Sequence, residues 1–129
     1  MAKLLLIEDE EFIRDLYKRQ LELAEFEVDA FANGTDGLKA IEEIVYDMVL
    51  LDIMLPDMSG IEILTKIKKS QNATMQKTPV VMITNLGDDS VIKEAFKIGA
   101  VGYLLKATFT PQQMVGEVKN LIQQYHRTS

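Results

Sequence analysis

The sequence predicts an α/β fold in which a doubly wound, five-stranded parallel sheet lies between two layers of helices, forming a three-layer sandwich. Short apolar runs alternate with longer amphipathic segments along the whole chain. One of these runs, MVLL at 48–51, contains no polar residue, as expected for a strand that helices cover on both faces of a parallel sheet. With right-handed crossovers between the strands, we expect the strand order 2-1-3-4-5.

The strands are expected where the apolar runs lie, at residues 4–7, 28–31, 48–51, 80–84 and 101–105. Between them, apolar residues recur at the spacing of an amphipathic helix. The five expected helices span residues 11–24, 35–45, 61–69, 89–98 and 111–125. The last has the clearest start, because Thr110 can cap it, Pro111 suits its first turn and Gln113 completes a capping box. Its inward-facing residues should be Met114, Val115, Val118, Leu121 and Ile122.

Composition places the chain among single-domain globular proteins and excludes several functional classes. It has 129 residues, of which 47% are apolar and 26% charged, close to the globular average. The absence of cysteine excludes a disulfide framework, thiolate catalysis and cysteine-ligated zinc. A net charge of −6 disfavours direct binding of nucleic acid, which depends on clustered Lys and Arg. Proteins and cations are therefore the expected partners.

The two ends of the chain bear on localisation and domain limits. The apolar run at 4–7 is too short for a signal peptide or a membrane span, so we expect a cytoplasmic protein without membrane insertion. We expect one domain over residues 1–125 and a tail over 126–129, in which the single histidine, His126, is solvated. A free-standing protein and a domain excised from a longer one both fit this layout.

Acidic residues follow two strands that should be neighbours in the sheet. Glu8 and Asp9 come directly after the first apolar run, and Asp52 comes directly after the third. In such sheets ligands bind at the carboxyl ends of the strands where the strand order reverses, here between the first and third strands. Three carboxylates held there repel one another unless a cation neutralises them, and an all-oxygen site suits Mg²⁺. Glu10 and Glu11 are better explained as an acidic first turn of the following helix.

A hydroxyl and an ammonium group are expected at the same edge of the sheet. Thr84 ends the fourth strand and Lys106 follows the fifth. Alone, each has an ordinary explanation, since threonine suits a strand and lysine suits a solvated surface. With Asp52 they form a chemical set, because a carboxylate that attacks phosphorus needs a metal to screen its charge and donors aimed at the phosphoryl oxygens. The pattern therefore points to phosphoryl transfer to Asp52.

These residues lie in segments that resemble the response-regulator receiver domain, the phosphoacceptor module of two-component signalling. The matching segments are LLLIEDE at 4–10, MVLLDIMLPDMSG at 48–60, VVMIT at 80–84 and GAVGYLLK at 99–106, and the resemblance extends over essentially the whole chain. It implies a flavodoxin-like fold, like that of chemotaxis regulators. It also implies a signalling protein and not an enzyme in the usual sense, since such a domain catalyses only its own phosphorylation and dephosphorylation.

By this resemblance, Asp52 accepts a phosphoryl group from the phosphohistidine of a sensor histidine kinase or a phosphotransfer protein. Asp9, Asp52 and the backbone carbonyl of Met54 ligate Mg²⁺, and Glu8 reaches the metal through water. The resemblance thus assigns the metal to the same acidic cluster that the strand ends predict.

The resemblance also implies a switch. Thr84 and Lys106 contact the phosphoryl group, and Tyr103 is the aromatic side chain that turns inward as Thr84 moves toward the phosphate. The change is expected on the surface of strand 4, helix 4, strand 5 and helix 5, where a downstream protein effector would dock. The oligomeric state stays open, including a dimer that forms on phosphorylation. On the fourth helix, either a small docking patch or part of a buried stripe is formed by Val91, Ala95 and Ile98.

Several positions depart from the family pattern. Lys106 is followed by Ala107 where receiver domains usually have Pro. A cis bond before a non-proline residue costs about 2.5 to 4 kcal/mol, so this bond is either trans with a re-routed loop or cis at that cost. Asn85 stands where a smaller residue is common, and we expect it to crowd the phosphoryl pocket. Met54 and Leu86 are apolar at positions that tune the phosphoryl lifetime, so we expect slow hydrolysis.

Three other functions fit the pattern less well. A phosphohydrolase that uses Asp52 as nucleophile would need a second acid where Met54 stands. A nucleotide or flavin site would need a glycine-rich phosphate cradle, but the first strand is followed by EDEE at 8–11. A receiver-like scaffold that docks partners without being phosphorylated is the main alternative, and Ala107 is its main support.

Overall fold

The structure, a computed structural model, describes residues 1–85, 89–106 and 108–126. Five parallel strands form one sheet in the order β2-β1-β3-β4-β5, as predicted. The strands are β1 (Lys3–Ile7), β2 (Glu27–Phe31), β3 (Met48–Asp52), β4 (Val80–Thr84) and β5 (Gly102–Leu105). Each strand begins and ends within one residue of its predicted bounds, because the apolar runs that define the strands are also the residues that the sheet buries.

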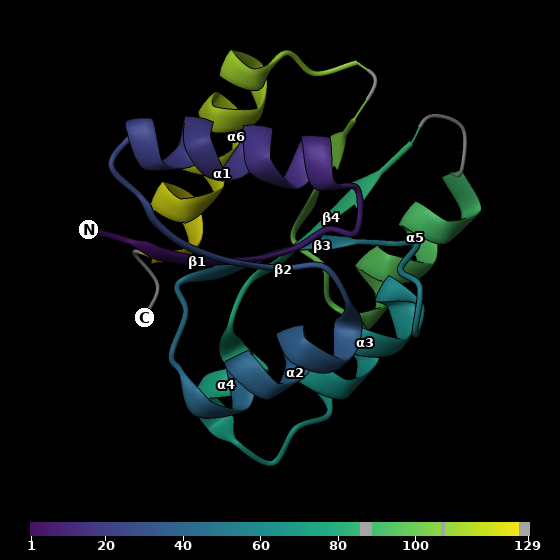
Figure 1. The fold of residues 1–129 in the computed structure, drawn as a ribbon. Helices are drawn as coiled ribbons and strands as arrows, with labels where there is room; N and C mark the ends of the chain where they lie inside the picture. The colour runs from purple at the N-terminus through teal and green to yellow at the C-terminus, as the bar shows by residue number, and fades with distance from the viewer. Residues whose placement is uncertain (86–88, 107, 127–129) are drawn as a thin grey trace.

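Helices cover both faces of the sheet, which gives the predicted three layers (Figure 1). One face carries α1 (Glu11–Leu23) and α6 (Pro111–His126). The other face carries α2 (Gly34–Glu43), α3 (Gly60–Lys68), α4 (Ala73–Lys77) and α5 (Asp89–Ile98). Within the described ranges, no helix has the length and apolar character that crossing a membrane requires.

The described residues form six helices, one more than the five predicted. The additional helix, α4, has five residues, too few to show a helical period in the sequence. Asn72 caps it, because its side chain accepts hydrogen bonds from the backbone N–H groups of Thr74 and Met75. Met75 is buried in the core and anchors this short helix against the sheet layer.

Alternate residues of the central strands pack into two separate hydrophobic clusters. On β1, Leu5 and Ile7 belong to the cluster under α2, α3, α4 and α5, whereas Leu4 and Leu6 belong to the cluster under α1 and α6. The strands β3 and β4 divide in the same way, and every residue of both is buried. This two-sided burial accounts for the unbroken apolar run at 48–51.

The capping box predicted at the start of α6 is present. The Gln113 N–H donates to Thr110 Oγ1 at 3.1 Å, and the Thr110 N–H donates to Gln113 Oε1 at 2.8 Å. The predicted inward residues all contact the cluster under α1 and α6, and they are Met114, Val115, Val118, Leu121 and Ile122. The helix includes His126, so it extends into the predicted tail, and residues 127–129 lie outside the described residues.

The helix α5 faces the core with two of the three residues considered for a docking patch, and Val91 is only partly buried. Ala95 is 1% exposed and Ile98 packs against the core, so these two residues form part of a buried stripe. The exposed aromatic residues on this side of the molecule are instead Phe96 and Tyr103. Their rings meet edge to face, with centroids 6.2 Å apart and an interplanar angle of 83°.

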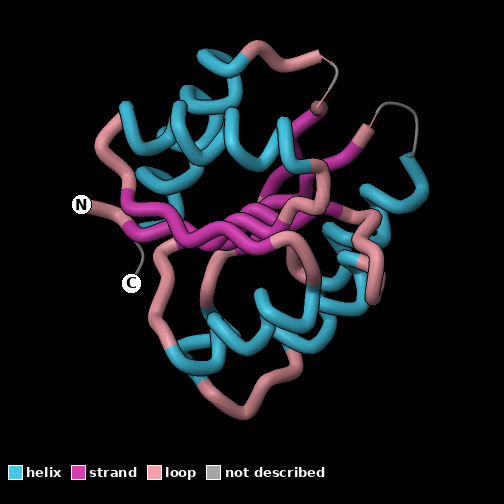
Figure 2. The backbone as a smooth tube through the Cα atoms, in the orientation of Figure 1, coloured by secondary structure: helices cyan, strands magenta, loops and turns pink. Residues whose placement is uncertain are grey.

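All five strands run in the same direction, so their carboxyl ends meet at one edge of the sheet. Figure 2 shows the loops that leave this edge gathered at the end of the sheet away from the N-terminus. Asp52 and Thr84 are the last residues of β3 and β4. Glu8 and Lys106 come directly after β1 and β5. The fold therefore carries these predicted site residues to one edge of the sheet.

Candidate functional site

Five of the seven predicted site residues line one cavity at the carboxyl ends of the strands, and they are Asp9, Asp52, Met54, Thr84 and Lys106. The cavity has a volume of about 470 Å³, and its lining consists of Asp9, Glu10, Asp52, Ile53, Met54, Thr84, Asn85 and Lys106. Glu8 is fully buried, at 0% exposure. Carboxylate oxygens of Glu8, Asp9 and Asp52 all lie within 4.8 Å of one another. The structure thus brings together acidic residues from two strands that the sequence separates by more than forty positions.

The Lys106 ammonium neutralises part of this acidic cluster. It donates to Asp52 Oδ2 at 2.9 Å, to Glu10 Oε1 at 2.9 Å and to Glu8 Oε2 at 3.1 Å. Burial lowers the pKa of Lys106, but the hydrogen bonds to these three carboxylates outweigh burial and raise the pKa above its usual value. Lys106 is therefore charged at neutral pH, and each of its three N–H groups has a carboxylate acceptor.

Glu8 has one carboxylate oxygen that is left without a donor. Its Oε2 accepts from the Glu10 N–H at 3.0 Å as well as from Lys106. Its Oε1 lies 3.0 Å from Lys106 Nζ, within ion-pair distance, but has no hydrogen-bond partner among the described residues. Burial raises the pKa of Glu8 to about 7. A buried carboxylate oxygen with free lone pairs, in an all-oxygen cluster, fits a hard divalent cation such as Mg²⁺.

The Asp52 carboxylate is held by one backbone N–H group and by the Lys106 side chain. The carboxylate accepts from the Met54 N–H at 3.1 Å through Oδ1 and from Lys106 through Oδ2. The Gly60 N–H donates to the Ile53 carbonyl at 2.7 Å, which brings the start of α3 against the end of β3. A Cβ atom on Gly60 would overlap the Asp52 carbonyl oxygen and lie 2.8 Å from Ile53 Cα. Only glycine therefore allows α3 to approach the strand that carries Asp52.

Thr84 lines the cavity, but its hydroxyl is hydrogen-bonded elsewhere, and Tyr103 lies outside the lining. Thr84 is 5% exposed, and its hydroxyl donates to the Asn85 carbonyl at 3.0 Å. Tyr103 is 40% exposed and contacts Phe96, so its ring lies outward. The hydroxyl can reach a ligand in the cavity only if it leaves the Asn85 carbonyl.

Two of the positions that depart from the family pattern border the cavity. Asn85 and Met54 both line it, and the Met54 side chain is 76% exposed. Crowding by Asn85 and shielding by Met54 stay predictions, because a lining position alone does not test either effect. Leu86 and Ala107 lie outside the described residues.

Two residues of the first loop and helix contact the site without having been predicted to do so. Glu10 does not act simply as an acidic residue at the start of a helix. Its carboxylate pairs with Lys106 and makes no capping hydrogen bond to α1. Arg14 donates from Nη1 to the carbonyls of Glu8 at 3.0 Å and Asp9 at 3.3 Å, which fixes the loop carrying both acids. An arginine in the first turns of a helix is usually solvated, so the sequence carries no signal for this contact.

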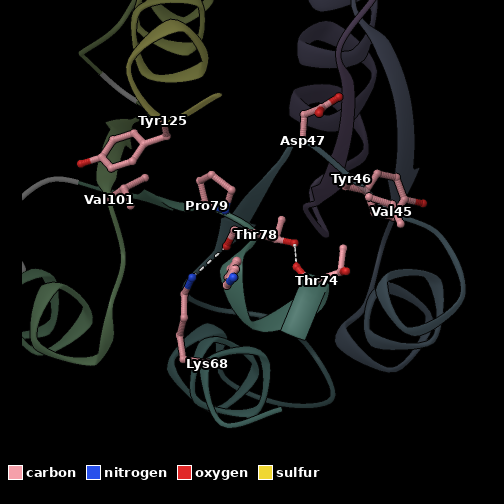
Figure 3. A pocket seen from close by; sticks show the side chains of 10 residues that line it. Val45, Tyr46, Asp47, Lys68, Thr74, Thr78, Pro79, Val101 and Tyr125 are labelled. Carbon is pink, nitrogen blue, oxygen red and sulfur yellow. Dashed lines mark hydrogen bonds between the residues drawn. The ribbon is translucent and has the colours of Figure 1, made fainter. Parts of the chain in front are cut away.

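A larger cavity, of about 500 Å³, lies at the opposite edge of the sheet, where β3, β4 and β5 begin (Figure 3). Its lining includes Lys68, which donates to the carbonyls of Gln76 at 3.1 Å and Thr78 at 2.8 Å. These contacts stabilise the C-terminal end of α4, where a cation is favoured. Among the described residues, only the smaller cavity adjoins a cluster of acids that could hold a metal, so the smaller cavity is the candidate site.

Comparison with known proteins assigns this chain to a family. The family model of the response regulator receiver domain matches residues 4–119. The transcriptional regulatory protein SrrA of Staphylococcus aureus is 35% identical over 127 residues, which are 98% of this chain and 50% of SrrA. The chain therefore spans about half the length of this curated relative. The chain belongs to the response-regulator receiver domains of two-component systems.

Solved structures agree with this assignment. A CheY-like receiver domain protein from Methanospirillum hungatei JF-1 is similar with a TM-score of 0.90 and 26% identity, covering 100% of this chain and 99% of that chain. A receiver domain protein from Clostridium thermocellum has a TM-score of 0.87 and 32% identity, covering 100% of both chains. These likenesses confirm the predicted flavodoxin-like fold and the resemblance noted from the sequence motifs.

Proposed function

We propose that this receiver domain is a phosphorylation-operated switch in which Asp52 accepts a phosphoryl group beside a bound Mg²⁺ ion. The observation that supports this most directly is the convergence of Glu8, Asp9 and Asp52 within 4.8 Å, next to the Lys106 ammonium. The donor would be the phosphohistidine of a sensor histidine kinase or a phosphotransfer protein. The domain would act in the cytoplasm and would catalyse no reaction beyond its own phosphorylation and dephosphorylation.

Asp9, Asp52 and the Met54 carbonyl would hold the ion, and Glu8 would reach it through water. When bound, Mg²⁺ would screen the negative charge of the carboxylate and of the phosphoryl oxygens. An Asp52 carboxylate oxygen attacks phosphorus, and the bond from phosphorus to the donor's imidazole nitrogen breaks as the new bond forms. Lys106, already hydrogen-bonded to Asp52, then donates to a phosphoryl oxygen, which places a fixed positive charge where negative charge accumulates.

The output of the switch would come from Thr84. Its hydroxyl would leave the Asn85 carbonyl and donate to the phosphoryl group, and Tyr103 would turn inward and leave Phe96. Moving a population from mostly inactive to mostly active takes roughly 5 kcal/mol, within reach of the new charge-assisted hydrogen bonds from Thr84 and Lys106. The altered surface would comprise β4, α5, β5 and α6, where a downstream protein effector would dock.

Phosphorylation is tested by incubating the protein with Mg²⁺ and acetyl phosphate and recording its intact mass. We expect a gain of one phosphoryl group that disappears with a chelator and in Asp52→Asn. Asp57→Asn is the matched control, because Asp57 lies on the same loop but binds the start of α2, and it should retain the gain. A wild-type protein that gains no mass would contradict the proposal and favour a scaffold that docks partners without phosphorylation.

A further inference from the structure

Methionine is the only kind of sulfur-containing residue in this chain, which has seven methionines and no cysteine. A peroxide that reaches the protein can therefore oxidise sulfur only at a thioether. Oxidation adds one oxygen atom and converts a flexible apolar side chain into a polar sulfoxide, which dedicated reductases can reverse. The methionine that is modified first is the one whose sulfur atom the peroxide can reach.

The methionines, all of which lie in the described part of the chain, differ sharply in their access to solvent. Four are at most 7% exposed, and they are Met48, Met75, Met82 and Met114. Met58 is partly buried and packs against the core, where its Sδ lies beside Gly34. Met1 is 88% exposed and Met54 is 76% exposed. Peroxide should therefore react with Met1 and Met54 before it reacts with the other five.

Met54 lies at the acidic site, whereas Met1 does not. Met54 lines the cavity together with Asp9 and Asp52. Its N–H donates to Asp52 Oδ1 at 3.1 Å, and its backbone forms a bridge with Ser59, so the main chain at Met54 is fixed relative to the carboxylate. Because Met54 both lines the cavity and is exposed, its side chain lies where the cavity opens to solvent. Met1 precedes β1 and lies at the opposite edge of the sheet (Figure 2).

The thioether and the sulfoxide have opposite effects on water at this opening. A thioether is a weak hydrogen-bond acceptor, so the Met54 side chain does little to hold a water molecule near Asp52. A sulfoxide oxygen is polar and accepts a hydrogen bond from water, which keeps the lone pairs of that water available for attack. Under the proposed function, the water would attack phosphorus, the bond from phosphorus to the Asp52 carboxylate oxygen would break, and inorganic phosphate would leave.

We propose that Met54 is a site of reversible oxidation by peroxide and that its sulfoxide shortens the lifetime of the phosphoryl group on Asp52. In the oxidation step, the sulfur lone pair attacks hydrogen peroxide and the O–O bond breaks. The sulfur keeps one oxygen atom, and the departing hydroxide takes the remaining proton and leaves as water. The sulfur is thus oxidised and the peroxide is reduced. The effect on the phosphoryl lifetime rests on the proposed function, whereas the oxidation itself does not.

The first measurement treats the folded, metal-free protein with hydrogen peroxide and locates the added oxygen by mass spectrometry of its peptides. We expect oxidation of Met1 and Met54, while the four methionines that are at most 7% exposed stay unmodified. In urea all seven should be oxidised, because unfolding exposes their sulfur atoms. Oxidation of Met54 no faster than that of the four buried methionines overturns the assignment of this site.

The second measurement follows the loss of the phosphoryl group in Mg²⁺ after acetyl phosphate is removed. Oxidised wild type should lose it about two- to tenfold faster than unoxidised wild type, as expected for one additional hydrogen bond to the attacking water. Met54→Leu is the matched control, because it keeps Met1 but has no sulfur at the cavity, so peroxide should not change its rate. Met54→Gln should lose the phosphoryl group faster than Met54→Leu without peroxide, because its amide oxygen is an acceptor like that of the sulfoxide.

An unchanged lifetime after oxidation of wild type overturns the effect on the phosphoryl group. Equal acceleration in Met54→Leu also overturns it, because the modified residue would then be Met1. A wild-type protein that gains no phosphoryl group contradicts the proposed function and, with it, the effect on the lifetime. The peptide masses still decide whether Met54 is the oxidation site.

Discussion

Lys106 controls the electrostatics of the acidic site in the absence of metal. Its side chain is 7% exposed and pairs with Glu8 and Asp52, whose side chains are 0% and 5% exposed. Charges this deeply buried are tolerated only when they are paired, and removing one partner leaves the others without compensation. The site therefore holds its acids together with an internal cation, which a bound metal ion would supplement.

Replacing Lys106 by methionine should destabilise the metal-free protein, because Glu8 and Asp52 would stay buried without a counter-charge. We expect a loss of about 3 kcal/mol in the free energy of unfolding, measured with urea in the presence of chelator. The control is Lys18→Met, which breaks an exposed 2.8 Å pair with Glu22 and should cost less than about 1 kcal/mol. Similar losses of unfolding free energy in the two variants would show that the buried ion pairs contribute no more to stability than an exposed pair.

Substitutions of Thr84 should separate phosphorylation of Asp52 from the structural change that follows it. Thr84→Ala keeps the carboxylates and Lys106, so it should still take up the phosphoryl group. It lacks the hydroxyl that would leave the Asn85 carbonyl, so the ring resonances of Tyr103 should not shift when beryllofluoride is added with Mg²⁺. Thr84→Ser restores the hydroxyl and should restore the shift in the NMR spectrum. A full Tyr103 shift in Thr84→Ala would contradict this role.

Single residues differ in how far the sequence reveals them. The positions of Asp52 and Thr84 follow from strand ends, because the carboxyl ends of parallel strands share one edge. The contacts of Glu10 and Arg14 depend on how the loop after β1 lies against Lys106 and the start of α1. No pattern in the sequence marks this loop conformation, so the two contacts emerge only from the three-dimensional structure.

The helix α3 begins at Gly60, directly against the backbone at the end of the strand that carries Asp52. Gly60→Ala would place a Cβ atom against the backbone of Asp52 and Ile53, and backbone atoms cannot rotate away. We expect a loss of about 2 kcal/mol or more in stability, together with weaker Mg²⁺ binding as the end of β3 shifts. Urea unfolding and calorimetry measure the two effects.

The control for this substitution is Gly116→Ala on α6, where an added Cβ would meet nothing within 4 Å. Alanine is favoured over glycine inside a helix by about 0.5 to 1 kcal/mol, so Gly116→Ala should stabilise the protein and leave Mg²⁺ binding unchanged. A stable Gly60→Ala protein with normal Mg²⁺ affinity would contradict the account of this contact.

Asp57 joins the loop after β3 to the start of α2. Its carboxylate accepts from the Gly34 N–H at 2.9 Å, the Thr35 N–H at 2.8 Å and the Thr35 hydroxyl. The Thr35 hydroxyl and then the Gly34 N–H lower the pKa of Asp57 to about 2. The folded pKa lies below the unfolded value of about 3.9, so this stabilisation is present above pH 4 and is lost as the pH falls through 2.

The stability difference between wild type and Asp57→Asn should therefore depend on pH in a defined direction. Urea midpoints should differ by a constant amount between pH 7 and pH 5, and the difference should shrink as the pH is lowered from about 4 to 2. The comparison isolates Asp57, because all other carboxylates titrate in both proteins. If the difference between the two urea midpoints grew on acidification, this would contradict the stabilising role of the Asp57 carboxylate.

Helices and strands in which apolar residues recur at a regular spacing were predicted well. The short helix α4, which has no such spacing, was not predicted. The strands and the longer helices follow runs and stripes of apolar residues. The helix α4 buries mainly Met75, and one buried residue makes no period. The helix α2 ends at Glu43, before the predicted end at 45, because Ile44 has an extended backbone and Val45 is 69% exposed.

At the scale of the whole molecule, the hydrophobic packing and the acidic site occupy different parts of the sheet. Two hydrophobic clusters hold the strands from both faces, while the acidic cavity lies at one edge where the strands end. Tyr103 lies on β5, which pairs with the strand β4 that ends at Thr84, and its ring meets Phe96 of α5. Under the proposed function, this arrangement would connect phosphorylation of Asp52 to the exposed rings of Tyr103 and Phe96.

The central claim is that Asp9 and Asp52 share one divalent cation, and paramagnetic NMR with Mn²⁺ in place of Mg²⁺ tests it most directly. The account predicts that substoichiometric Mn²⁺ broadens the amide resonances of residues 8–10 and 52–54 first, and that Asp9→Asn or Asp52→Asn removes this selective broadening. Broadening centred on other acidic surfaces, or unchanged by either substitution, would contradict the account.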